Sequence, residues 1–172
     1  MSAYLIDAFD FCHRHETVDG VYEVAALPRL VRECTDASGQ LHWSLQGAHG
    51  KFDHPQLKLA VAGSLHLMCQ RCLQPYAFSL DTHSTLVLAA DDASADAIEQ
   101  QIDDDAVDVI VGTHQMDVMA LVEDDALLAL PFAPVHEVCP SMPAGAVNEA
   151  VNVQKPSPFA VLQELASRRR DT

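Results

Sequence analysis

The sequence predicts an α+β fold in which a strongly curved or barrel-like antiparallel sheet is covered by a few short helices. First, apolar and polar residues alternate with period two through much of residues 41–88, as in half-buried strands. Second, separate segments outside this region have the apolar spacing and end signals of short helices. Third, apolar residues make up 49% of the 172-residue chain, which is enough for one sizeable core.

The strands follow from the alternation. Leu41, Trp43 and Leu45 are separated by polar residues, and a similar alternation runs from residue 57 past Gly63. The glycine predicts either two strand pieces or one bent strand with a bulge. The expected strands are 21–24, 41–46, 57–68, 76–88 and 107–111, and those within 41–88 form an antiparallel meander.

The helices are predicted mainly from their ends. Pro28 suits a first helical position, Asp117 suits an N-cap, and Pro131 stops the helix that follows Asp117. Because an isolated hairpin is unstable, the helices must cover an apolar face of the sheet. The expected helices are 27–34, 117–130 and 159–167, and residues 4–11 form either a short strand or a helical turn.

One α+β domain is expected over residues 1–143. Residues 144–172 are expected to be a linker and a C-terminal helix with a basic end. Within the domain, residues 89–105 are acidic and contain no aromatic residue. This composition predicts a mobile surface insert with one helical turn near residues 97–101.

The net charge of −15 is unevenly placed along the chain. Residues 1–71 carry 6 basic and 8 acidic groups, residues 72–154 carry 15 acidic groups and no Lys or Arg, and residues 155–172 carry 4 basic and 2 acidic groups. Affinity for nucleic acid depends on Lys and Arg, so this surface disfavours autonomous binding of DNA, RNA or an anionic membrane. It favours a basic protein as the partner.

Two acidic groups of side chains are the candidate contacts with such a partner. The first group is residues 103–105, in the predicted insert. The second group is residues 123–125, on the predicted helix 117–130, where consecutive carboxylates fan over the exposed side and form no convergent site. At the other end of the chain, residues 168–170 are all Arg and could add a small local contact with RNA. The acidic candidates are Asp103, Asp104, Asp105, Glu123, Asp124 and Asp125.

The cellular location is predicted to be the cytoplasm. No apolar run approaches the roughly 20 residues of a membrane span, and the first residues lack the basic and apolar regions of a signal peptide. In a reducing compartment, the five cysteines are expected to be thiols or metal ligands rather than a disulfide framework. Cys12 and Cys34 lie in apolar surroundings and are expected to be buried thiols.

The spacing of four residues points to a metal site. Cys69 and Cys72 have the separation of a knuckle that binds one tetrahedral metal ion, and His136 and Cys139 repeat that separation in a proline-bounded loop. Three sulfurs and one nitrogen are a known ligand set of closed structural zinc sites. The pattern therefore predicts one structural zinc ion. The alternative is that the cysteines are reduced thiols and His136 is an ordinary loop histidine.

Catalytic motifs are missing from the sequence. It contains no G-x-S-x-G elbow, P-loop or G-x-G-x-x-G motif. The three consecutive aspartates 103–105 lack EF-hand spacing, so a solvated loop is expected there. A thioredoxin-like role is disfavoured because the C-x-x-C pair lies between strands rather than at the start of a helix.

Several short motifs occur in the sequence in the order that a known protein family has. Two of them are specific when they occur together, Cys69-Gln-Arg-Cys72-Leu73 and Pro158-Phe-Ala-Val-Leu162. With the segments 27–30, 57–63 and 117–136, they make the chain similar to the bacterial YceD family, the large ribosomal RNA subunit accumulation proteins. The resemblance covers residues 21–165. Ser157 departs from the Asn that is commoner in the family, but both residues cap helices.

The resemblance implies a non-enzymatic factor that supports accumulation of large-subunit ribosomal RNA. A basic ribosomal protein or a pre-ribosomal particle is the implied partner, without a small-molecule substrate. Two other hypotheses stay open: a zinc- or thiol-dependent enzyme that uses the C-x-x-C pair, and a module that only buffers a cationic partner. The residues carried over from the family are Cys69, Arg71, Cys72, His136 and Cys139, and Arg71 is added to the candidate partner contacts.

Overall fold

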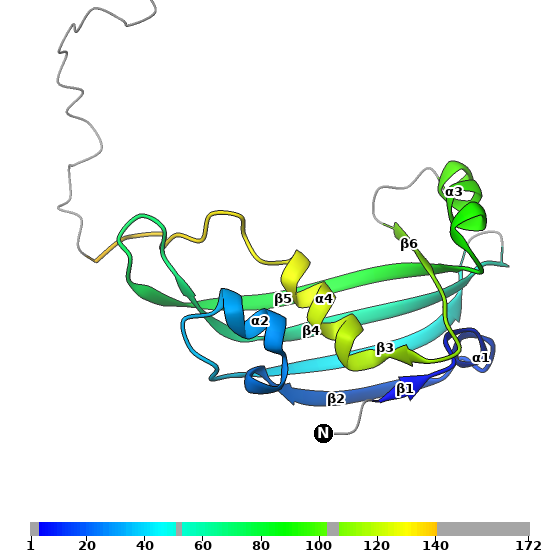
Figure 1. Cartoon of the computed structure of the whole chain (residues 1–172), viewed down its shortest axis with the longest axis horizontal. Coiled ribbons are helices and arrows are strands. Elements are labelled where there is room, and N and C mark those ends of the chain that lie inside the picture. The colour runs from blue at the N-terminus through cyan, green and yellow to red at the C-terminus, as the bar shows by residue number, and fades with distance from the viewer. Residues whose placement is uncertain (1–3, 51–52, 103–106, 141–172) are drawn as a thin grey trace, which may run out of the picture. The chain divides into compact units, whose positions relative to one another are not determined.

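A five-stranded sheet with short helices packed against it forms the body of the molecule (Figure 1). The structure is a computed structural model that describes residues 4–50, 53–102 and 107–140. The elements are β1 (Leu5–Ile6), α1 (Ala8–His13), β2 (Thr17–Glu23), the 3-10 turn η1 (Val24–Ala26), α2 (Pro28–Glu33), β3 (Gln40–His49), β4 (Pro55–Met68), β5 (Pro75–Ala89), α3 (Asp92–Gln101), β6 (Val107–Val111), β7 (Met116–Asp117) and α4 (Val118–Leu128). The predicted linker and the helix 159–167 lie outside the described residues.

The α+β class is confirmed, with a correction to the sheet. The strand order is β2-β3-β4-β5-β6, antiparallel as far as β5, but β6 pairs with β5 in parallel. The parallel pairing arises because α3 carries the chain back to the start of the next strand. Within the described residues, β2 and β6 are the two edges of an open sheet, so a closed barrel is not formed. The short strands β1 and β7 pair separately.

The core lies on one face of the sheet. The alternating residues Leu41, Trp43 and Leu45 of β3 are buried, as predicted from period two, and so are Leu57 and Leu59 of β4. Helices α1 and α4 pack against these strands, and α2 packs against α4. The helices that were predicted at 27–34 and 117–130 are present as α2 and α4, and the ambiguous residues 4–11 contain both a strand and a helix.

Gly63 does not break β4. The strand is continuous from Pro55 to Met68, and Gly63 pairs with Leu41 on one side and Leu80 on the other. A Cβ atom at Gly63 would lie 2.4 Å from the carbonyl oxygen of Gln40. The glycine therefore allows two backbones to approach closely, and the predicted bulge is wrong.

Most of the segment predicted as a mobile insert is an ordered helix. Asp91 and Ser94 form a capping box at the start of α3, in which the Ser94 N–H donates to Asp91 Oδ1 at 2.7 Å and the Asp91 N–H donates to Ser94 Oγ at 3.0 Å. Ile98 and Ile102 pack on Val87 and Ala89 of β5 in a second, smaller core. The composition of the insert concealed this helix because only two large apolar side chains attach it to the sheet.

Glu123 of α4 is buried, with 5% of its surface exposed, so the expected fan of exposed carboxylates is wrong at this position. Its Oε1 accepts the backbone N–H groups of Arg29 at 2.7 Å and Leu30 at 3.1 Å, and its Oε2 accepts Arg29 Nε at 2.8 Å. Leu27 offers no capping side chain to α2, so Glu123 supplies the cap from another helix. Hydrogen bonds to Glu123 and then Asp124 raise the pKa of Arg29.

Asp125 is also turned inward, onto the sheet. Its two carboxylate oxygens accept hydrogen bonds from the hydroxyl groups of Thr82 and Ser84 on β5. Asp124 is the exposed member of the three and forms an ion pair with Arg29. Two of the three candidate partner contacts on α4 therefore hold the helix in place on the fold.

None of the helices in the described ranges has the length and hydropathy needed to cross a membrane.

Replacing Glu123 by Ala removes an acceptor shared by two backbone N–H groups and a guanidinium group. We expect Glu123→Ala to lower the free energy of unfolding by about 2–4 kcal/mol, measured by urea denaturation. Glu123→Gln retains one carbonyl acceptor, so it should lower the free energy of unfolding by less than Glu123→Ala does. The neighbouring Asp124→Asn is the matched control and should change stability by less than about 0.5 kcal/mol. Equal losses at the two positions would contradict the capping role.

Candidate metal centre

The first half of the site is the tight turn between β4 and β5. The Cys69 N–H donates to the carbonyl of Gln74 at 3.0 Å, and the Leu73 N–H donates to the carbonyl of Cys69 at 2.9 Å. Leu73 has a positive φ of 57°, which closes the turn. These bonds bring the sulfur atoms of Cys69 and Cys72 to one side of the hairpin end.

The second half is the extended segment that follows α4. Its prolines at 131 and 134 prevent the helix from continuing, and the chain returns to the hairpin. There the Gln70 N–H donates to the carbonyl of Pro134 at 2.8 Å, and Gln70 Nε2 donates to the carbonyl of Phe132 at 3.3 Å. Gln70 was not among the predicted site residues, although its position inside the C-x-x-C turn is the signal for such a role.

Cys69, Cys72, His136 and Cys139 converge, and one ligand atom from each lies within 4.8 Å of all the others. The Sγ atoms of Cys69 and Cys139 are 3.8 Å apart, and Cys72 Sγ is 3.3 Å from His136 Nδ1. A tetrahedral ion with bonds of about 2.3 Å to sulfur and about 2.0 Å to nitrogen places two sulfurs about 3.8 Å apart and a sulfur and a nitrogen about 3.5 Å apart. The four residues could therefore hold a metal ion, as the spacing predicted.

The thiols of the cluster differ in acidity. Burial acts to raise the pKa of Cys69, but hydrogen bonds from the backbone of His136 and Cys72 outweigh it and lower the pKa to about 5. Burial raises the pKa of Cys72, and the neighbouring sulfurs of Cys69 and Cys139 raise it further. The protein thus favours the thiolate form of Cys69 and disfavours the thiolate form of Cys72. A bound cation would favour the thiolate form of both residues.

Arg71 lies against this cluster. Its Nε donates to Cys139 Sγ at 3.0 Å and its Nη2 donates to the carbonyl of His136 at 2.6 Å, while much of the side chain stays exposed. Tyr76 lies beside His136, with 5.0 Å between the ring centroids and 43° between the ring planes. The guanidinium group therefore offsets negative charge on the sulfur ligands and fixes the backbone of the second half.

The other two cysteines lie elsewhere. Cys12 is buried, its thiol donates to the carbonyl of Gln56 at 3.2 Å, and burial raises its pKa. Cys34 is half-buried, and burial raises its pKa as well. Neither belongs to the cluster. The prediction of buried thiols is confirmed for Cys12, whereas Cys34 is only half-buried.

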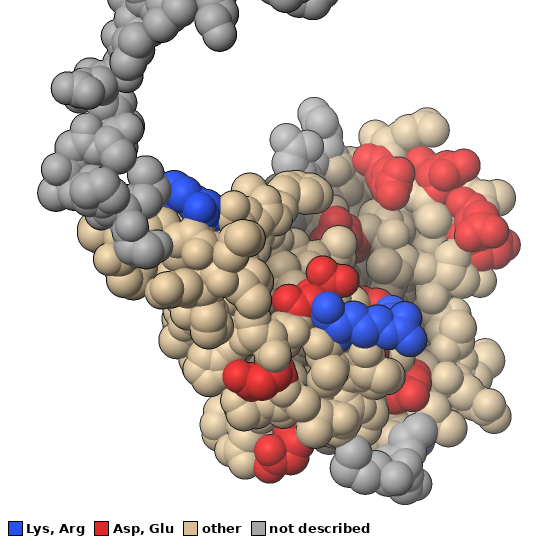
Figure 2. Space-filling model, turned by 60° about the vertical axis from the view of Figure 1, so that its left-hand side comes forward, with Lys and Arg blue, Asp and Glu red and all other residues tan. Residues whose placement is uncertain are grey.

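The acidic candidates are not brought together into one site. Asp103, Asp104 and Asp105 lie outside the described residues, and Glu123 and Asp125 are engaged within the fold. Acidic side chains nevertheless predominate on the face drawn in Figure 2.

The sequence was also compared with known proteins. The sequence model of the family described as large ribosomal RNA subunit accumulation protein YceD matches residues 57–166, a range that includes all four candidate ligands. The chain belongs to this family. A relative from Haemophilus influenzae with the same description is 26% identical over 172 residues, which cover 95% of this chain and 95% of the relative. No solved structure matches the chain.

Arg71 offers a test of the surroundings of the cluster in this YceD-family chain. Arg71→Lys retains the positive charge but loses the planar group that reaches both Cys139 and the backbone of His136. We expect the metal-loaded variant to release its ion to a colorimetric chelator about tenfold faster than the unmodified chain. Arg14→Lys, at the end of α1, is the matched control and should not change the rate. Identical release from all three proteins would contradict the role of Arg71.

Proposed function

We propose that this chain is a non-enzymatic factor that supports accumulation of large-subunit ribosomal RNA in the cytoplasm. The observation that carries the proposal is membership of the family whose description names that role. The relative that aligns with 95% of this chain bears the same description. The net charge of −15 on this chain favours a basic direct partner, either a basic ribosomal protein or a basic surface of a pre-ribosomal particle. Contact with RNA would be weak or local.

The ion in the Cys69, Cys72, His136 and Cys139 cluster is proposed to be one structural zinc. Three sulfurs and one nitrogen are a ligand set that suits zinc, and four protein ligands leave no open position for a substrate. The chemistry that zinc supplies there is a cross-link between the β4–β5 turn and the segment after α4. Arg71 and the backbone of His136 orient the sulfur ligands of that cross-link.

The alternative of a thiol-dependent enzyme has one observation in its favour, the lowered pKa of Cys69. However, the Cys69 side chain is fully buried, with 0% exposure. A disulfide substrate would have to reach this sulfur, so burial favours a structural role. Reversible exchange between Cys69 and an added disulfide would reverse this assignment.

Metal analysis tests the zinc assignment. We expect the purified full chain to contain about one zinc per chain and Cys139→Ser to lose it, because one of four ligands is removed. Cys34→Ser is the matched control and should retain the ion. Full zinc content in the Cys139→Ser variant would contradict the assignment of three cysteines and one histidine.

Sedimentation of ribosomal particles tests the cellular function. In cells lacking the chain, we expect the ratio of large to small subunits and the amount of large-subunit RNA to fall, and expression of the full chain to restore both. The tagged chain should co-sediment with a precursor of the large subunit. An unchanged subunit ratio together with no co-sedimentation would contradict the proposal.

A further inference from the structure

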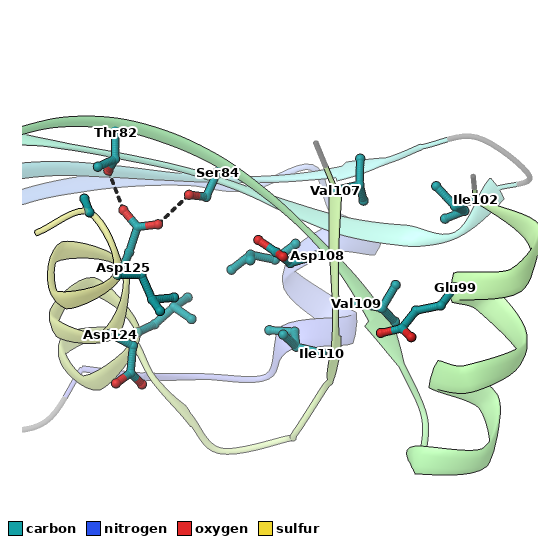
Figure 3. Close-up of a pocket in the computed structure, with 14 residues that line it drawn as sticks. Thr82, Ser84, Glu99, Ile102, Val107, Asp108, Val109, Ile110, Asp124 and Asp125 are labelled. Atoms are coloured by element: carbon teal, nitrogen blue, oxygen red, sulfur yellow. Dashed lines mark hydrogen bonds between the residues drawn. The ribbon is translucent and has the colours of Figure 1, made fainter. Parts of the chain in front are cut away.

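A groove separate from the metal centre opens between α3 and α4. Its volume is about 830 Å³, and β6 and the end of β5 form its floor. In the close-up of Figure 3, Glu99 of α3 lies on one side, Asp124 and Asp125 of α4 lie on the other, and β6 runs between them. The groove is wide enough for several side chains of a ligand.

Apolar side chains from α4 and both strands line this groove, together with Ile102 directly after α3. They include Val109 and Ile110 of β6, Leu86 of β5 and Leu121 of α4. Leu128, in the last turn of α4, is 85% exposed at its edge. An exposed leucine beside an apolar floor is a feature of surfaces that bind a partner.

The charged residues of the groove are all acidic. Asp124 and Asp125 are already engaged by Arg29 and by hydroxyl groups of β5. Glu99 and Asp108 are exposed, and no ion pair between described residues involves either of them. These two carboxylates are therefore available to a ligand.

No Lys or Arg is among the described residues that line the groove. The reason lies in the sequence, because every wall comes from residues 82–129, within the stretch 72–154 that contains no Lys or Arg. Figure 2 shows acidic side chains bordering a hollow on this face. A nucleotide or RNA phosphate would meet a lining that carries four carboxylates, of which only Asp124 is paired with an arginine, Arg29. Lys and Arg side chains combine an aliphatic stem with a cationic end, so they complement both the floor and the rim.

We propose that this groove binds a basic, partly apolar peptide segment of a partner protein, with its aliphatic groups against β6 and Leu128 and its cations at Glu99 and Asp108. The inference rests on the proposed function, because it gives the expected basic partner a place on the molecule. The two carboxylates lie on different elements, α3 and β6, so the cations of one segment would bridge the helix and the strand.

The test uses the full chain and a short synthetic peptide of Lys and Leu with amphipathic helical spacing, with binding followed by fluorescence anisotropy. The paired peptide has Glu at every Lys position and should not bind. We expect the double variant Glu99→Gln/Asp108→Asn to bind the basic peptide about three- to tenfold more weakly. We expect Leu128→Ala to weaken binding about fivefold with no change in charge.

The controls separate the groove from general attraction to an acidic protein. Asp19→Asn/Asp81→Asn removes the same number of charges near a different pocket, and Val21→Ala shortens another exposed apolar side chain. Both control variants should bind the peptide with an affinity within about twofold of that of the unmodified chain. Equal weakening by the two double variants, or binding of spermine as tight as that of the peptide, would overturn the proposal in favour of non-specific attraction or a polyamine site.

The outcome is distinguishable from failure of the proposed function. If the basic peptide does not bind but the chain still restores large-subunit RNA, the groove proposal is wrong and the proposed function stands. If peptide binding depends on Glu99, Asp108 and Leu128 while the subunit ratio is unaffected by loss of the chain, the groove stands and the proposed function is wrong.

Discussion

The position of α4 depends on one buried carboxylate. Glu123 accepts hydrogen bonds from two backbone N–H groups at the start of α2 and from the guanidinium group of Arg29, so it joins α2 to α4. Because α2 has only six residues, it could not persist without tertiary contacts. The same hydrogen bonds hold α4 in position on the fold, while the prolines at 131 and 134 prevent the helix from continuing. From the end of α4 the chain continues to the second half of the metal centre, and Leu128 at that end forms an edge of the acidic groove.

The candidate metal centre would meet a different need, which is to hold an irregular segment against the end of a long hairpin. Residues 131–140 contain no helix or strand, and several of their apolar side chains are exposed, including Phe132 and Val138. Packing alone therefore gives this segment little stability. Three thiolates around a divalent cation carry a net charge of −1, and Arg71 beside Cys139 offsets that charge. With a divalent cation bound, the four residues and Arg71 would together make a nearly neutral cross-link at the hairpin end.

The sequence predicted those parts of the molecule in which local pattern and tertiary environment agree. Alternation revealed β3 to β5 because one face of the sheet is buried, and the C-x-x-C and H-x-x-C spacings revealed the four candidate ligands. It did not reveal that β6 is parallel, because α3 lies within an acidic segment and is attached by only Ile98 and Ile102. Nor did it reveal that Glu123 points inward, since the N–H groups that it accepts belong to residues more than 90 positions earlier. Both errors arise from long-range contacts.

The net charge is best understood through the stretch that carries it. Two pairs of acidic residues in 72–154 have different physical roles. Glu123 and Asp125 are turned into the fold, where they accept hydrogen bonds from backbone N–H groups, hydroxyl groups and Arg29. Glu99 and Asp108 remain at the surface beside apolar side chains. Surface carboxylates alone would attract any cation, whereas carboxylates beside an apolar floor favour cations with aliphatic stems. Discrimination between basic partners would therefore come from the apolar residues, and attraction from the acidic ones.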